Sequence, residues 1–248
     1  MYTVTFDRIH EVSQTGNPVT TPFARIFIPL LCTGLSLFLT ACNKSEPLEQ
    51  QIVLTNGHVY SMAWGDPDLD GVPSPDAPFE NGIWYPDAEA IYISGDEILY
   101  VGTNEGALAQ AHSSAEIIDV AGAVVIPRAA SIGQNDVNLF DRLFSAITSY
   151  EENGNPDRNE DGKRKKTPEE ALRMYTVWAV NRASAEASAS SLVAGNRANL
   201  TVLSVDPLNV LLPGEEGIGI PVSELLDGQI EMTMIEGTIV HNRVILLQ

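Results

Sequence analysis

The stretch AEAIYISGDEILYVG, residues 88–102, decides the fold class of this chain. Its β-branched and aromatic residues form two apolar runs on either side of Gly95-Asp96, a pattern that predicts two antiparallel strands joined by a turn. Two similar pairs of runs lie nearby: Ile52–Thr55 and His58–Met62 around Asn56-Gly57, and Glu116–Val120 and Ala123–Ile126 around Ala121-Gly122. We therefore expect residues 51–126 to form an antiparallel β-unit, with Asn56-Gly57 as a further hairpin turn and one short helix at Gly106–His112.

Helical patterns begin after Pro127. The segment Leu139–Tyr150 has apolar residues at helical spacing. Thr167-Pro168-Glu169-Glu170 predicts the start of a second helix that runs toward Ala185, because it combines a cap, a proline at the first position and acids in the first turn. Strands return at Leu200–Val205, Ile230–Ile235, Thr238–Val240 and Val244–Leu246. The fold class is therefore mainly β with two helices.

The two β-blocks, residues 51–126 and 199–246, are expected to share one sheet system. Neither block has enough strands to bury both of its faces alone. The apolar stripes of the two helices also need a partner, and we expect them to lie against an open face of that system.

The chain is strongly acidic. It has 248 residues, of which 14 are Lys or Arg and 33 are Asp or Glu, giving a formal net charge of −19. This charge repels phosphate backbones, so nucleic acid is not expected as a partner. The acidity has two explanations, solubility or carboxylate clusters that bind hard cations.

The N-terminal region predicts an exported lipoprotein. Ile26–Leu39 is an uncharged apolar run, too short and too interrupted for a membrane span, which indicates a signal peptide over residues 1–42 rather than a buried helix. The run ends in Leu39-Thr40-Ala41-Cys42, which resembles the lipobox of bacterial lipoproteins and implies a lipid on the thiol of Cys42. Residues 43–50 are then a polar tether. Asn43 resembles the signal for the outer membrane, so we expect a lipid anchor there, with the body facing the periplasm.

Several stretches resemble the amidohydrolase superfamily, closest to the group that includes N-substituted formamide deformylases. They are IVLTNGHVYSM (52–62), AEAIYISGDEILYVGTNEGALA (88–109), AEIIDVAGAVVIP (115–127), TPEEALRMYTVWAVNRAS (167–184), SSLVAGNRANLTVLSVDPLNV (190–210) and IEMTMIEGTIVHN (230–242). The resemblance implies a composite β-sandwich whose N-terminal half is residues 51–127 and whose C-terminal half is residues 191–248. In that family the sandwich lies beside a catalytic barrel that hydrolyses C–N bonds, typically non-peptide amides, with zinc-type divalent metals.

Nearly all of that barrel is missing from this chain. In the family, V-I-P is followed by a P-G-x-x-D-x-H-x-H motif whose histidines bind the metal, whereas here Pro127 is followed by RAASI. A complete TIM barrel needs roughly 200 residues or more, whereas only residues 128–166 lie between Pro127 and the helix that begins at Thr167. We expect residues 128–190 to be a barrel remnant of helices and an acidic linker. Asp136, in SIGQND, is the one position that corresponds to the family's catalytic aspartate.

These features predict a truncated amidohydrolase-family lipoprotein that lacks the hydrolase activity and does not bind the family's metal. The four histidines, His10, His58, His112 and His241, have no partner two residues away with which to bind one ion. The surface that would face the barrel is a candidate site of self-association.

Two acidic loops match the first half of a calcium loop. They are Asp66, Asp68 and Asp70 before Gly71, and Asp157, Asn159 and Asp161 before Gly162. Oxygen ligands at alternate positions can point to one centre, and the glycine permits the sharp turn. The glutamate of position 12 is absent, since Ala77 and Pro168 stand there. Solvated turns explain the same pattern, so a calcium-stabilised, lipid-anchored binding or structural β-domain is the alternative function.

Overall fold

A computed structural model describes residues 50–129, 138–148, 165–183 and 190–244 of the chain. All of these residues belong to one compact unit of the chain, within residues 46–248. The helices of these described ranges are all too short or too polar to cross a membrane.

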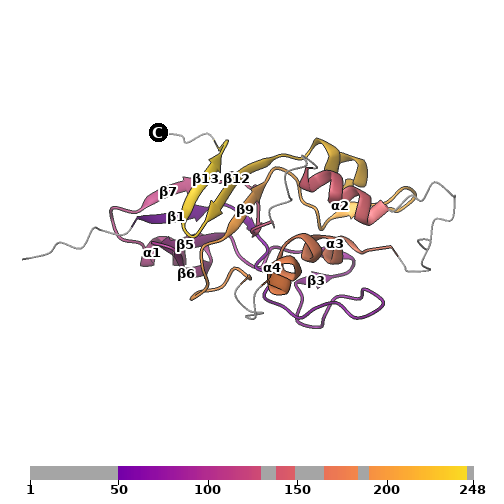
Figure 1. The fold of residues 1–248 in the computed structure, drawn as a ribbon, viewed down its shortest axis with the longest axis horizontal. Helices are drawn as coiled ribbons and strands as arrows, with labels where there is room; N and C mark the ends of the chain where they lie inside the picture. Colours follow the sequence, from indigo (N-terminus) through magenta and orange to yellow (C-terminus); the bar gives the residue numbers. More distant parts are fainter. Residues whose placement is uncertain (1–49, 130–137, 149–164, 184–189, 245–248) are drawn as a thin grey trace, which may run out of the picture. The chain divides into compact units, whose positions relative to one another are not determined.

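The described strands form two main sheets with a hydrophobic core between them (Figure 1). The first sheet has the order β6 (Glu97–Gly102), β5 (Ala90–Ser94), β1 (Gln51–Thr55) and β7 (Glu116–Asp119). The second has the order β13 (Thr238–Asn242), β12 (Ile230–Ile235), β9 (Leu200–Leu203), β8 (Val124–Pro127) and β2 (His58–Val59). No closed barrel forms in the described part, and the mainly β fold class is confirmed.

The expectation that the two β-blocks share one sheet system is also confirmed. Strand β8 of the first block pairs antiparallel with β9 of the second, with Val124 opposite Leu203. Leu54 and Ile118 pack in the same buried cluster as Met234, so the core between the sheets also joins the two blocks.

The predicted hairpin at Asn56-Gly57 is wrong. Strands β1 and β2 lie in different sheets, and the chain crosses between them at this dipeptide. The crossing at Ala121-Gly122 runs alongside, so β1 pairs parallel with β7 and β2 pairs parallel with β8. The first block is therefore mixed instead of antiparallel. The burial pattern explains the difference, because four consecutive residues at the end of β1 are buried and a hairpin strand with one solvent face would alternate.

Other sequence-based elements are confirmed. Strands β5 and β6 form the predicted hairpin around Gly95-Asp96, and β12 and β13 form another in the second block. Of the strand predicted at Val244–Leu246, Val244 lies in no strand and residues 245–246 lie outside the described residues. The short helix is α1 (Asn104–Gln110), which packs through Ala107 on the outer face of the first sheet, against Val53 and Tyr92.

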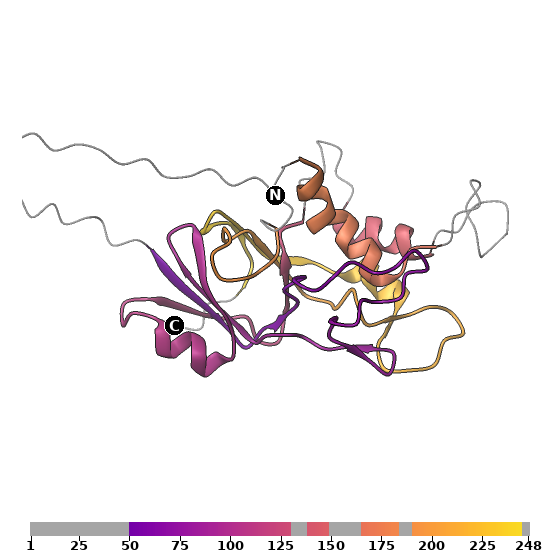
Figure 2. The same cartoon turned by 90° about the horizontal axis from the view of Figure 1, so that it is seen from below.

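The remaining helices cover the outer face of the second sheet. They are α2 (Leu139–Thr148), α3 (Pro168–Tyr175), α4 (Val177–Ala183) and the 3-10 helix η1 (Val222–Asp227). Their buried residues join one cluster with Val124, Ile126 and Leu203 of β8 and β9, which confirms the expected packing. Figure 2 shows α2 and α3 at the end of the unit opposite α1.

The predicted second helix begins where the sequence places it but breaks early. Thr167 accepts a hydrogen bond from the backbone of Glu170, whose side chain accepts one from Thr167 in return, so the two form a capping box. Thr176 then has non-helical angles of φ −120° and ψ −102°, which separates α3 from α4. Two minor strand pairs complete the helical end: β3 (Phe79–Glu80) with β4 (Ile83–Trp84), and β10 (Val210–Leu211) with β11 (Ile220–Pro221).

Candidate functional site

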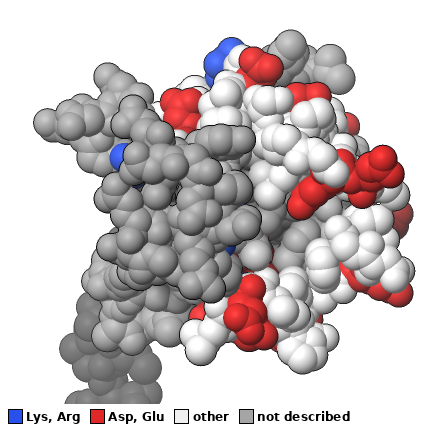
Figure 3. Space-filling model, turned by 90° about the vertical axis from the view of Figure 1, so that its right-hand side faces the viewer, with Lys and Arg blue, Asp and Glu red and all other residues white. Residues whose placement is uncertain are grey.

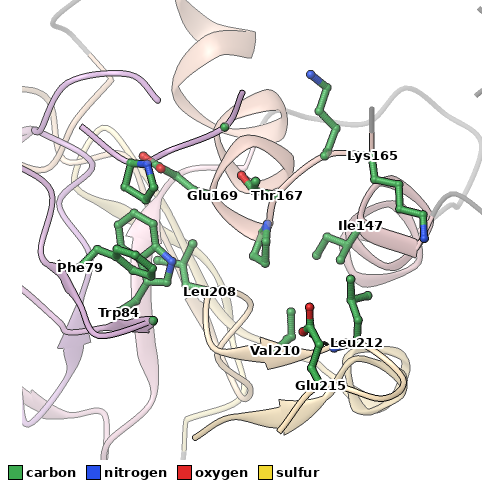
Figure 4. Close-up of a pocket in the computed structure, with 15 residues that line it drawn as sticks. Phe79, Trp84, Ile147, Lys165, Thr167, Glu169, Leu208, Val210, Leu212 and Glu215 are labelled. Carbon is green, nitrogen blue, oxygen red and sulfur yellow. Dashed lines mark hydrogen bonds between the residues drawn. The ribbon is translucent and has the colours of Figure 1, made fainter. Parts of the chain in front are cut away.

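A cavity of about 370 Å³ lies at the helical end of the unit (Figure 4). Four segments of the chain enclose it: residues 71–84, which include the β3–β4 hairpin, the end of α2, the start of α3 with the residues just before it, and residues 208–215. Its apolar walls come from Phe79, Trp84, Ile147, Leu208, Val210 and Leu212, and its charged lining residues are Lys165, Lys166, Glu169 and Glu215. This volume lies within the range of pockets that bind small molecules.

Aromatic rings form one wall of the cavity. The ring centroids of Phe79 and Trp84 lie 5.0 Å apart at an interplanar angle of 48°, and Trp64 lies 5.7 Å behind Trp84. Tilted pairs at such distances are favourable arrangements of aromatic quadrupoles. The guanidinium of Arg173 lies 5.4 Å from the Trp64 ring and completes the stack.

Hydrogen bonds between the Asn209 side chain and the backbone of Trp84 fix the aromatic wall in place. The Asn209 side chain accepts from the Trp84 N–H at 2.8 Å and donates to the Trp84 carbonyl at 2.9 Å. The same Asn209 amide donates to Asp206 at 2.9 Å, and the Tyr60 hydroxyl donates to that carboxylate at 2.9 Å. Burial and the Asp206 charge raise the pKa of Tyr60 above its ordinary value, so its hydroxyl remains a donor. The wall is therefore preformed.

A buried ion pair lies beside the aromatic wall. Glu169 Oε1 accepts from Arg173 Nε at 2.8 Å and from Trp64 Nε1 at 2.8 Å. Arg173 also donates to Asp66 at 3.1 Å, so one guanidinium meets two carboxylates. The second oxygen of Glu169, Oε2, is buried and has no hydrogen-bond partner among the described residues.

The charged groups of the cavity are unevenly placed. Figure 4 shows Glu169 at the end formed by Phe79 and Trp84, and Lys165 at the opposite end beside Ile147. The carboxylate of Glu215 points toward the middle of the cavity in the same view. Figure 3 shows that Asp and Glu far outnumber Lys and Arg on this face, within the part of the chain that the structure describes.

A second hollow of about 610 Å³ adjoins the first. It is lined by Phe144, Leu211, Pro221 and Val222, and it shares Lys165, Leu212 and Glu215 with the first cavity. Residues of α2 line both hollows, Ile147 the first and Phe144 the second.

In the first predicted calcium loop, Asp66 and Asp68 form hydrogen bonds with other groups of the protein. Asp66 accepts hydrogen bonds from Arg173 at 3.1 Å and from Trp178 at 2.8 Å. Asp68 accepts from the backbone N–H groups of Asp70 and Val72, each at 2.9 Å. The side chains therefore serve the protein's own loop and helix, and calcium binding there stays a prediction.

The other predicted site residues lie outside the described residues. They are the lipidation site Cys42, the candidate catalytic Asp136, and Asp157, Asn159 and Asp161 of the second acidic loop. Those predictions stay as stated.

The histidines of the described ranges do not form a metal site. His58 lies in β2, His112 follows α1 and contacts Ser114, and His241 in β13 contacts the Ile230 carbonyl. Within those ranges, no three side chains of His, Cys, Asp or Glu gather at one point. The residues present there do not fit the zinc-type metal that the resemblance implies.

Sequence reasoning missed this cavity. Phe79, Trp84 and Glu215 lie in segments that the sequence identifies only as loops rich in Asp, Pro and Gly or as connections between strands. The one signal for the buried ion pair is the four-residue spacing of Glu169 and Arg173 on a predicted helix.

Comparisons with known proteins give a local likeness. No family model matches the chain, and no curated protein matches it. It is similar to two solved structures of uncharacterized metal-dependent hydrolases, from Pyrococcus furiosus at 22% identity and from Pyrococcus horikoshii OT3 at 19%, each with a TM-score of 0.21. Each alignment covers 40% of this chain, which spans only 16% of the length of the matched structure.

Proposed function

We propose that this chain is an exported lipoprotein that binds a small molecule in the cavity beside α3, on a β-sandwich that resembles the amidohydrolases. The observation that supports binding is the cavity itself, with a volume of about 370 Å³ and walls that are largely apolar and aromatic. Pockets of small molecules combine such walls with a few placed polar groups.

The wall's rigidity also supports binding. The Asn209 side chain bonds both the N–H and the carbonyl of Trp84, and Asp206 and Tyr60 hold Asn209 in turn. A preformed wall spends little of the binding free energy on ordering side chains.

We further propose that the chain does not catalyse the hydrolytic reaction of the amidohydrolases that it resembles. The described ranges gather no three metal-ligating side chains, and the family's paired histidines are absent from the sequence. The test is purified protein loaded with zinc and assayed with an N-formyl amine. We expect no stoichiometric zinc and no turnover above background, and hydrolysis by the zinc-loaded protein would overturn this proposal.

Binding is tested with an uncharged probe, 3-phenyl-1-propanol, and is measured by calorimetry and by tryptophan fluorescence. Phe79 lines the cavity and is 37% exposed, so Phe79→Ala removes part of the wall without emptying a core. We expect this variant to bind at least about fivefold more weakly, which corresponds to about 1 kcal/mol of lost contact. Tyr85→Ala is the matched control, because Tyr85 is 46% exposed and does not line the cavity. Equal binding by the two variants would contradict the proposal.

Export and anchoring are proposed from the lipobox. Metabolic labelling with palmitate should give a band with the parent chain and none with Cys42→Ala. A band that persists in the variant would remove the anchor from the proposal. Self-association through the surface that would face the barrel is tested by the mass of the delipidated protein in solution.

A calcium-stabilised β-domain is the second candidate. The conformation of the first acidic loop favours it. Asp68 accepts hydrogen bonds from the backbone N–H groups of Asp70 and Val72, and Gly71 has a φ of 81°. Calcium would have to draw Asp66 away from Arg173. Calorimetry that gives no heat, together with no rise in melting temperature, would remove this candidate.

A further inference from the structure

We infer that the ligand of this cavity is an organic cation, an ammonium group attached to an aromatic or aliphatic body. The inference rests on the proposed function and names the chemical class of its ligand. It follows from which charged groups face the cavity and which of them the protein already neutralises.

Glu215 presents a negative charge to the middle of the cavity (Figure 4). One of its oxygens, Oε2, accepts the backbone N–H of Leu212 at 2.8 Å, which holds the carboxylate beside the apolar walls. A carboxylate in this position favours a cation next to it.

The ion-pair cluster at the aromatic end adds negative charge. Arg173 is shared between Glu169 and Asp66, so two carboxylates are balanced by one guanidinium. Glu169 lines the cavity, and its buried Oε2 has no hydrogen-bond partner in the described residues. Because this oxygen is buried, Glu169 acts on a ligand through its negative charge beside the cavity and not by direct contact.

The lysines that line the cavity do not reverse this balance. Lys166 forms an ion pair with Glu170 at 3.3 Å, one turn into α3. Lys165 lies at the far end from Glu169 and Trp84 (Figure 4). The aromatic end therefore combines negative charge with ring faces.

Ring faces attract cations as well. The Phe79 and Trp84 rings lie 5.0 Å apart in the cavity wall, and an ammonium within about 6 Å of such a ring is attracted by its quadrupole. The formal net charge of −19 also raises the concentration of cations near the surface. The adjoining hollow along α2, lined by Phe144, Pro221 and Val222, provides apolar surface for the body of the ligand.

The test compares three probes of the same shape at neutral pH by calorimetry: 3-phenylpropylammonium, 3-phenyl-1-propanol and 3-phenylpropionate. We expect the cation to bind about tenfold more tightly than the alcohol, a ratio that corresponds to about 1.4 kcal/mol. The anion should bind more weakly than the alcohol. Added salt should weaken the binding of the cation and leave that of the alcohol unchanged.

Glu215→Gln identifies the charge that is responsible. The amide can still accept the Leu212 N–H, so the loop keeps its shape, and the preference for the cation should fall about threefold. Glu116→Gln is the matched control, since Glu116 is exposed in β7 and does not line the cavity.

The outcomes separate the two proposals. Equal affinity for cation and alcohol, or tighter binding of the anion, would overturn the cation inference and leave small-molecule binding intact. The absence of binding by all three probes would overturn the proposed function together with the inference. An unchanged preference in Glu215→Gln would remove Glu215 from the recognition of the cation.

Discussion

Arg173 and Glu169 form an ion pair across one turn of α3, with 2.8 Å between Nε and Oε1 and with side chains that are only 3% and 1% exposed. The other guanidinium nitrogens reach Asp66 and the carbonyls of Trp64 and Gly65. The Arg173 side chain thus links α3 to the acidic loop that contains Asp66. A buried charge that loses its partner keeps the cost of its desolvation, so this pair sets the stability of the helical end.

Arg173→Met should lower the free energy of unfolding by about 3–5 kcal/mol, because it leaves the Glu169 carboxylate buried without a countercharge. Urea denaturation of the purified protein measures this loss. Asp66→Asn is the control, since the Asp66 side chain is 63% exposed and its removal should cost less than about 1 kcal/mol. The double variant Glu169→Leu with Arg173→Met should regain part of the lost stability. Equal losses of stability in Arg173→Met and Asp66→Asn would contradict the buried-pair explanation.

The sequence locates α3 well because its start depends on local interactions. Thr167, Pro168 and Glu170 are a cap, a first-position proline and a capping-box acid, and each acts within one turn. The sequence does not separate the roles of the two adjacent acids. Glu170 bonds the backbone of Thr167, whereas Glu169 is buried by Trp64, which lies 105 positions away in the chain. Such a partner is set by tertiary packing.

The crossing at Asn56-Gly57 has a similar explanation. The dipeptide has the local conformation of a turn, with Asn56 at a φ of 56°, but the partners of β1 are β5 and β7. Local propensity indicates that the chain turns there and gives no information about which sheet the next strand joins. The cavity was beyond prediction for the same reason, since four separate segments of the chain enclose it.

Thr167→Ala should cost about 1 kcal/mol, because the backbone N–H of Glu170 loses its acceptor at the start of α3. Thermal unfolding measures the loss. Thr167→Ser keeps the hydroxyl and should retain most of the stability. If the alanine and serine variants melted together, the capping box would have no energetic role.

Tyr60 should make the folded chain sensitive to alkali. Its pKa is raised by burial and by Asp206, so the folded chain keeps this proton above about pH 10, where the unfolded chain releases it. The unfolded state then binds fewer protons than the folded state, and stability that is present below about pH 10 falls as the pH rises above it. Urea midpoints at about pH 8 and about pH 11 measure the fall.

Tyr60→Phe separates this effect from other alkaline changes. The variant should lose about 1 kcal/mol at about pH 8, with its hydrogen bond to Asp206, and should then decline less steeply than the parent. Tyr85→Phe, at an exposed tyrosine, should decline as steeply as the parent. A Tyr60→Phe slope equal to that of the parent would assign the alkaline loss to other groups.

Gly237 should tolerate no side chain, because it lies where the turns of the two β-blocks meet. It has a φ of 73° in the β12–β13 turn, and a Cβ placed there would lie 1.8 Å from the Gly95 carbonyl oxygen in the β5–β6 turn. The obstructing atoms belong to the backbone, so they cannot rotate away as a side chain would.

Gly214 is the matched control for Gly237, since it has a φ of 91° and a Cβ there would meet no atom of the described residues within 4 Å. Gly214→Ala should cost about 1–2 kcal/mol for the left-handed conformation alone. Gly237→Ala should cost at least about 2 kcal/mol more, because the two turns must separate. Urea denaturation of both variants measures the difference, and equal losses would show that the contact between the turns does not hold the two halves of the sandwich together.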